Sequence, residues 1–213
     1  MLKNQKGISL VELIAALPLT VLVFVIMTMA VANFVSTYNE TRLYIQLQDE
    51  LYSVVDMIRH GYVEEGIEAD DGLIGLMTAN RVEVAGNRNA ITLRPVVITE
   101  GLPDAYRTTY FVDSEGRMSV SGRYGLSAFQ ETQIFPSSNR KIGRELQFKI
   151  TNPNNVFTVT KSSTNGPIMI KINLQGEVRF REKEMGQNPE EDKKLNTKSV
   201  EFETSVFVAN TKG

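Results

Sequence analysis

The pattern of hydrophobic and polar positions begins with a long apolar run near the N-terminus. Residues 13–35 are 23 consecutive positions without a charged side chain. A helix of this length, at about 1.5 Å per residue, crosses a hydrocarbon layer of about 30 Å. Pro18 lies inside the run and removes a backbone hydrogen bond to Ile14, so we expect a kink or a loosened turn there. The pattern predicts that residues 8–35 form a transmembrane helix.

An amphipathic pattern follows without a break. Residues 36–60 contain neither proline nor glycine, and Gly61 is suited to end a helix in the left-handed conformation. The two patterns together predict one helix from Ile8 to His60, about 80 Å long at 1.5 Å per residue. Six apolar side chains of its second half fall within about 120° of one another at 100° per residue. We expect this stripe to be the core contact with the following domain: Leu43, Leu47, Leu51, Val54, Val55 and Ile58.

Beyond Gly61 the apolar period changes from 3.6 to 2, which is typical of strands with one buried face. Clusters of glycine, asparagine, aspartate and proline separate the segments and favour hairpin turns. The predicted strands are 81–84, 91–97, 106–112, 117–120, 146–150, 156–161, 168–174 and 200–208. Residues 122–143 have an irregular pattern that predicts no element.

These elements predict an α+β protein. We expect a long N-terminal stem helix that packs on a largely antiparallel β-sheet head formed by residues 61–213. The helix is transmembrane in its first half (8–35) and amphipathic in its second half (36–60). The 213 residues allow one anchor and one domain of about 150 residues, which is enough for a proper core.

Composition narrows the function classes. The net charge of −2 and the pI near 5.6 do not predict binding to nucleic acid. The chain contains no cysteine and one histidine, His60, so we expect no disulfide framework, no thiolate or histidine metal site and no catalytic triad. We therefore expect a non-enzymatic protein without a metal or a cofactor.

Two polar segments have simple interpretations. The heavily charged stretch Glu182–Lys198 is expected to be a solvated excursion between the last two strands. Asp70-Asp71-Gly72 has oxygen ligands in the manner of a calcium loop, but further acids at suitable offsets are missing. We interpret it as a turn.

The residues before the apolar run carry the most specific signal. The sequence Lys6-Gly7-Ile8-Ser9-Leu10-Val11-Glu12 places a carboxylate at the entrance of the run. A charged acid near the bilayer centre costs on the order of 3 kcal/mol, so a plain anchor does not explain it. The stretch resembles the type IV prepilin signal. The resemblance implies a leader of residues 1–7, a membrane peptidase that cuts after Gly7 and methylates Ile8, and Glu12 as the fifth mature residue.

Two other targeting interpretations stay open. Ala30-Val31-Ala32 before Asn33 resembles a signal-peptidase site, but the apolar run before it is longer than the usual 7–15 residues. An uncleaved single-span anchor is the second. Neither accounts for Glu12. In each case the basic residues Lys3 and Lys6 predict that the N-terminus stays in the cytoplasm and that the head lies outside.

The order of elements narrows the resemblance within the prepilin family. A long helix with Leu51-x-x-Val54-Val55-x-x-Ile58-Arg59 comes first, the 106–112 strand with its following glycine turn is next, and a strand ending Phe207-Val208-Ala209-Asn210 closes the chain. This order resembles the J-type minor pseudopilins of type II secretion and the W-type minor pilins of type IV pili. The absence of cysteine differs from major pilins that a C-terminal disulfide closes.

The resemblance implies a structural subunit that initiates a filament or caps its tip. Its partners would be other pilins or pseudopilins, the prepilin peptidase and methyltransferase, and an inner-membrane assembly platform. It would first be a single-pass inner-membrane protein and then part of a periplasmic or surface filament. In the apolar filament core, the α-amino group of a neighbour's Ile8, cationic at its ordinary pKa of about 8, would pair with Glu12.

The alternative from a different class is a membrane-tethered extracytoplasmic β domain that binds a ligand or partner as a monomer. A hydrolase ranks third, because one histidine and no cysteine leave no set of nucleophile, base and acid to nominate.

Overall fold

A computed structural model describes residues 10–63, 73–95, 106–124, 127–142, 145–161, 167–180 and 197–208. The chain divides into two compact units, Met1–Leu43 and Tyr44–Gly213. The first unit contributes the beginning of the long helix. The second contributes the end of that helix and all of the strands found in the described residues. Each unit is described by itself.

The helix α1 extends from Leu10 to His60 (51 residues) and continues through Pro18, which does not end it. Its C-terminal boundary is the predicted one. Gly61 follows with φ +107°, a backbone conformation that residues with a Cβ rarely adopt. Arg59 and His60 occupy the last turn, where positive charge interacts favourably with the helix dipole.

The first sheet has five antiparallel strands in sequence order. They are β3 (Arg81–Val84), β4 (Ala90–Arg94), β5 (Tyr106–Val112), β6 (Met118–Tyr124) and β7 (Ser127–Phe135). The two predicted hairpins, β3–β4 and β5–β6, are confirmed by their registers. In the β5–β6 turn, Gly116 has φ +82°, as a tight turn of this kind requires.

Residues 122–143, to which the sequence pattern assigned no element, contain strand structure. β6 continues to Tyr124, β7 covers most of the following residues, and the short strand β8 (Lys141–Ile142) comes later. Register shifts between Met118 and Ser119, and between Val120 and Gly122, interrupt the pairing of β6 with β7. Such irregularities break the period of 2 by which strands are recognised in a sequence.

The second sheet is built around β12 (Ile168–Arg179). Two short strands, β10 (Phe148–Ile150) and β11 (Phe157–Lys161), pair with β12, and β13 (Thr197–Val208) pairs with it along its whole length. Burial alternates at every position of β12, so the predicted division into one buried and one wet face is confirmed. β12 and β13 are longer than predicted.

Four further short strands and one 3-10 helix belong to the described part of the second unit. β1 (Gly61–Tyr62) pairs with β2 (Leu73–Ile74), and β8 pairs with β9 (Glu145–Leu146). A 3-10 helix, η2 (Pro153–Asn155), precedes β11, where the sequence shows the breaker Asn152-Pro153-Asn154.

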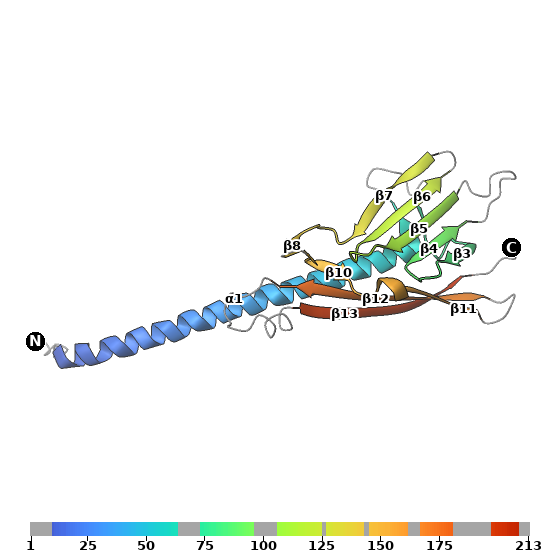
Figure 1. Ribbon diagram of the computed structural model, residues 1–213. Coiled ribbons are helices and arrows are strands. Elements are labelled where there is room, and N and C mark those ends of the chain that lie inside the picture. Colours follow the sequence, from blue (N-terminus) through green and yellow to red (C-terminus); the bar gives the residue numbers. More distant parts are fainter. Residues whose placement is uncertain are drawn as a thin grey trace, which may run out of the picture. The chain divides into compact units, whose positions relative to one another are not determined.

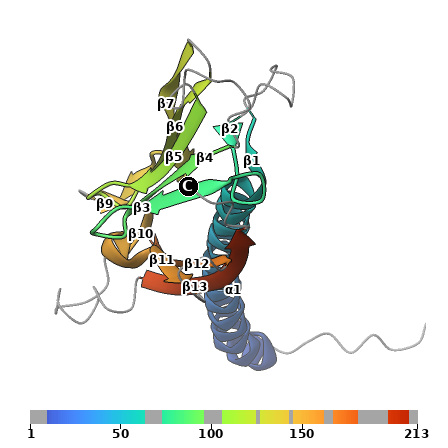
Figure 2. The same cartoon turned by 90° about the vertical axis from the view of Figure 1, so that its right-hand side faces the viewer.

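The core of the second unit lies where the last turns of α1 meet both sheets. Figures 1 and 2 show these turns with the five-stranded sheet above and the β10–β13 sheet below. Tyr110 of β5 is fully buried, and its hydroxyl donates a hydrogen bond to the Met57 carbonyl at 3.0 Å or to the Ile74 carbonyl at 3.3 Å. Burial raises the pKa of Tyr110 well above its ordinary value. The α+β class with antiparallel sheets is confirmed.

Candidate functional site

The first unit exposes its apolar side chains. Every described residue from Leu10 to Val35 is exposed, and large side chains such as Phe24 and Phe34 are more than 70% accessible. Among the described residues, one helix, α1, has the length and composition to cross a membrane. An exposed apolar surface of this extent in water would drive association, so the segment is suited to lipid or to apolar protein partners.

The hydroxyl groups within this apolar segment bond to the helix itself. Thr20 donates to the Ala16 carbonyl at 2.9 Å, and Thr28 donates to the Phe24 carbonyl at 2.8 Å. In a bilayer core, where water is absent, such bonds to the carbonyl four residues earlier satisfy the hydroxyl internally. The two threonines are therefore compatible with a lipid environment.

Of the residues in the predicted processing signal, the structure describes Glu12 but neither Gly7 nor Ile8. Gly7 and Ile8 lie outside the described residues, as does the rest of the 1–7 leader. Glu12 lies in the first turn of α1 and is exposed, a position where a carboxylate interacts favourably with the helix dipole. Its pairing with a neighbour's amine stays a prediction.

The predicted stripe of the second helical half is mostly interior. Leu47, Leu51, Val54, Val55 and Ile58 are at most 3% exposed, whereas Leu43, the last residue of the first unit, is only half-buried. Side chains at this level of burial contribute to stability by removing apolar area from water. This face of α1 is core and is unavailable for contact with another molecule.

A strand glycine accommodates two side chains of this stripe. At Gly176 of β12 a Cβ would lie 2.7 Å from Leu51 Cδ1 and 3.1 Å from Leu47 Cδ1. Glycine inside a strand often marks such a close approach. The sequence carried this signal, a glycine in a run of alternating apolar residues, but it did not indicate which side chain would approach.

A second link joins α1 to the loop after β7. The Glu50 carboxylate accepts hydrogen bonds from the Ser137 backbone N–H at 3.0 Å and from its hydroxyl at 2.8 Å, and Gln46 donates to the same carboxylate at 3.0 Å. Glu50 and Ser137 are 87 residues apart in the chain, so no local pattern could predict the contact. The contact attaches that loop to the helix.

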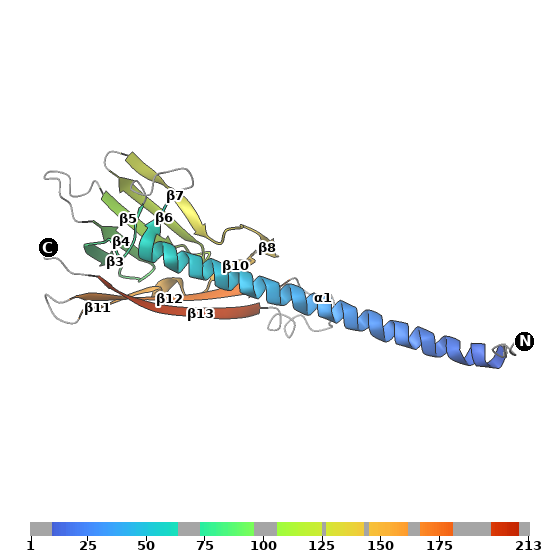
Figure 3. The ribbon, with the colours of Figure 1, turned by 180° about the vertical axis from the view of Figure 1, so that it is seen from behind.

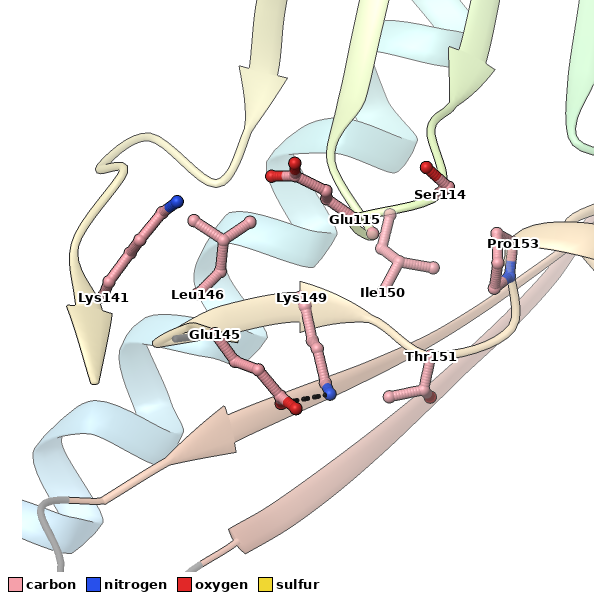
Figure 4. A pocket seen from close by; sticks show the side chains of 10 residues that line it. Ser114, Glu115, Lys141, Glu145, Leu146, Lys149, Ile150, Thr151 and Pro153 are labelled. Atoms are coloured by element: carbon pink, nitrogen blue, oxygen red, sulfur yellow. Dashed lines mark hydrogen bonds and ion pairs between the residues drawn. The ribbon is translucent and has the colours of Figure 1, made fainter. Parts of the chain in front are cut away.

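A surface pocket of about 490 Å³ provides a candidate site for the ligand-binding and hydrolase interpretations. Figure 4 shows the turn Ser114–Gly116 on one side, Lys141 of β8 on another, and the segment from Glu145 to Thr151 along the floor. The pocket is therefore formed by segments that the sequence pattern assigns to separate elements or to none.

Two of the charged residues that line the pocket, Glu145 and Lys149, form an ion pair. Glu145 accepts from the Lys149 ammonium at 2.9 Å and from the Arg179 guanidinium at 2.8 Å, and the first of these contacts appears as a dashed line in Figure 4. The hydrogen bond from Lys149, together with the Arg179 charge, lowers the pKa of Glu145. A carboxyl group with a lowered pKa is a poor general acid at neutral pH. The two ion pairs connect β9 with β10 and with β12.

Metal binding has no support within the part of the chain that the structure describes. No group of three or more histidine, cysteine, aspartate or glutamate side chains is positioned there to hold an ion. The Asp70-Asp71-Gly72 turn and most of the charged Glu182–Lys198 stretch lie outside the described residues, so their interpretations stay predictions.

The candidate functional site is thus the exposed apolar half of α1, with Glu12 at its start. The buried half of the same helix belongs to the core of the second unit. Comparison of the chain with protein-family models, with curated proteins and with solved structures finds no match in any of the three.

Proposed function

We propose that this chain is a pilin-like structural subunit, a minor pilin or pseudopilin that is made as a membrane-anchored precursor. After cleavage behind Gly7 and methylation of Ile8, it is drawn from the inner membrane into a filament. Other pilins or pseudopilins pack against its apolar helical half, and an inner-membrane assembly platform moves it. The head lies outside the cytoplasm.

One observation carries this proposal. A single helix, α1, combines an exposed half without charge from Leu13 to Val35 with a half whose apolar stripe is buried in a β-rich unit. If α1 only completed the core, its exposed apolar half would have no function. If α1 were only a membrane anchor, it would not have to continue from Val35 to His60, without proline or glycine, into the core.

Glu12 gives the apolar half a second use beside anchoring. Moving its carboxylate into an apolar filament core is costly unless a cation compensates it. The newly exposed α-amino group of a neighbouring Ile8 provides that cation and sets the axial position of one subunit against the next. Residues 8–35 therefore serve first as the anchor and then as the assembly interface.

The processing step provides the direct test. The protein is produced in a host that contains a prepilin peptidase, and its intact mass and N-terminal sequence are measured. The proposal expects a chain that starts at methylated Ile8 with 206 residues, 213 − 7. A chain starting at Asn33, with 181 residues, 213 − 32, would refute the proposal in favour of a secreted β domain. An intact chain in the presence of an active peptidase would favour a tethered monomer.

A further inference from the structure

β13 lies at the margin of the second sheet, below β12 in Figures 1 and 3. It has 12 residues, and within the described residues β12 is the strand that pairs with it. Twelve consecutive register pairs, from Ile168 opposite Val208 to Arg179 opposite Thr197, join the two strands without a shift. β13 is therefore a long and regular edge strand.

The hydrogen bonds on the other side of β12 show which main-chain groups of β13 point outward. The Asn173 and Arg179 N–H groups and the Gln175 carbonyl bond to the segments that precede β11 and β10. In an antiparallel ladder, a residue directs both main-chain groups to one side, and the side alternates along the strand. The even-numbered residues of β12 therefore face β13.

The even-numbered residues of β12 lie opposite even-numbered residues of β13, as in the pair Leu174 and Phe202. These pairs exchange the ladder hydrogen bonds. The odd-numbered residues of β13 consequently direct their N–H and C=O groups away from β12. The outward row includes Ser199, Glu201, Glu203 and Ser205, all exposed.

Natural edge strands usually carry features that discourage further pairing, such as proline, bulges or charged side chains, lysine above all. The charges on the outer face of β13 are negative, so they discourage an acidic strand but not a basic one. β7, at the margin of the first sheet, has two register shifts against β6. β13 contains neither proline nor glycine and has no register shift. Its one lysine, Lys198, lies over the Phe180 ring at 5.6 Å. The edge of β13 is accordingly suited to receive another strand.

The two faces of β13 differ in chemistry. On the outer face, Glu203 accepts from Lys171 of β12 at 2.8 Å, and Glu201 accepts from Asn173 at 3.1 Å and from Gln175 at 3.2 Å. β12 thus provides partners for these carboxylates from one side only. On the inner face, Val200, Phe202 and Thr204 are half-buried, whereas Ile172 and Leu174 beside them on β12 are fully buried.

A side chain of α1 lies beside the half-buried residues on the inner face of β13. Tyr52 of α1 is 60% exposed, and its ring meets the Phe202 ring edge-on with 6.0 Å between centroids. A strand placed beside β13 would lie next to the half-buried side chains of Val200, Phe202 and Thr204. Apolar side chains on the incoming strand would therefore bury area on this face.

We propose that β13 binds an extended segment of a partner protein by main-chain pairing, and that this segment alternates basic and apolar residues. Its lysines or arginines lie opposite Glu201 and Glu203, two residues apart on one face. Its apolar residues lie beside Val200, Phe202 and Thr204 on the other. Strand addition of this kind takes affinity from main-chain bonds and specificity from alternate side chains.

Charge argues against a second copy of this chain as the occupant. In the two antiparallel registers that pair 11 of the 12 residues of each β13 strand, Glu203 lies opposite Glu201 or opposite itself. Like charges directly opposite one another destabilise a strand pair. The proposal does not depend on filament assembly, because the edge belongs to the second unit alone.

The test uses the full-length protein in a non-ionic detergent and a labelled 12-residue peptide that alternates lysine and valine. Fluorescence anisotropy measures the Kd. A peptide alternating glutamate and valine is the charge control, and the lysine peptide with N-methylated alternate amides is the main-chain control. We expect the lysine peptide to bind at least tenfold more tightly than either control.

Variants of β13 locate the binding site. Ser205→Pro removes an outward N–H without removing a ladder bond, a position where an edge strand tolerates proline. We expect it to weaken peptide binding at least tenfold while the thermal midpoint changes little, and we expect the matched Ser205→Ala variant to bind as wild type does. Replacing Glu201 and Glu203 by glutamine should weaken binding by about 2- to 30-fold, the range for two cross-strand charge pairs.

Three outcomes would overturn the proposal. If the N-methylated peptide bound as tightly as the lysine peptide, main-chain pairing would not be used. This comparison uses the wild-type protein, so a folding defect of a variant cannot affect it. Equal binding of the glutamate peptide would contradict the charge assignment. Self-association of the wild type that Ser205→Pro abolishes would identify a second copy as the occupant instead.

Discussion

Leu51 of α1 packs against the position where Gly176 of β12 has no side chain. A Cβ at residue 176 would lie 2.7 Å from Leu51 Cδ1, closer than carbon atoms approach in proteins, and Leu51 is fully buried. A residue with a side chain at position 176 would therefore require Leu51 to shift, and the glycine allows the close approach of α1 to β12.

Substitution of Gly176 tests this contact. We expect Gly176→Ala to lower the free energy of unfolding by about 1–3 kcal/mol, the usual cost of adding a methyl group to a filled core. A Cβ at residue 86 would meet no atom within 4 Å, so Gly86→Ala is the matched control and should be near neutral. Chemical denaturation measures both. In a double-mutant cycle, Leu51→Val should reduce the stability loss that Gly176→Ala causes. If the two substitutions changed the free energy of unfolding additively, the contact between the two residues would be contradicted.

A charge introduced into the stripe tests its role as core. Leu51→Lys would bury an ammonium group without a partner among apolar side chains and should cost several kcal/mol. Gln48→Lys, three residues earlier on the exposed side of α1, should change the thermal midpoint little. An unchanged midpoint for Leu51→Lys would mean that the stripe is not core but a surface between subunits.

Removal of the Glu12 charge tests assembly. Glu12→Gln keeps the size and polarity of the side chain but removes its attraction for a neighbour's amine. We expect membrane insertion and cleavage after Gly7 to survive, while crosslinking to partner pilins in membranes falls sharply and a cleaved, membrane-bound pool accumulates. If Glu12 only extends toward the interface beside Lys6, the variant would crosslink as wild type does. Glu40→Gln, a charge removal beyond the apolar run, is the control.

The lowered pKa of Glu145 predicts a dependence of stability on pH. The Lys149 hydrogen bond favours the ionised carboxylate in the folded chain, so its contribution is complete above the ordinary value of 4.5 and is lost as pH falls through the lower folded value. Glu145→Gln should therefore show a smaller loss of stability on acidification from about pH 5 to pH 3. Because the side chain is 47% exposed, solvent screens the pair and the effect is modest.

Denaturation midpoints of wild type and Glu145→Gln at several pH values provide the measurement. Lys149→Met removes the main cause of the lowered pKa while it leaves the carboxyl group in place, and it should flatten the acid limb in the same direction. An acid limb that is steeper in either variant than in the wild type would contradict the assigned sign.

Much of the local structure could be predicted because it depends on short-range physical chemistry. The end of α1 at His60 follows from the conformational freedom of Gly61. The alternation of β12 follows from the two faces of a strand, one of which must leave water. The α+β class, the two hairpins and the burial of most of the stripe were available from the same periodicities. Glu12 and its apolar run are features of the sequence itself.

Tertiary structure decided what depends on segments far apart in the chain. β7 was invisible to the period of 2 because its pairing with β6 contains register shifts. The approach of Leu51 to Gly176, the bond of Glu50 to Ser137 and the position of β13 at an edge are consequences of which strands pair and in what order. The residues of a strand indicate which of its faces is buried. Which other strands it pairs with depends on the packing of the whole core.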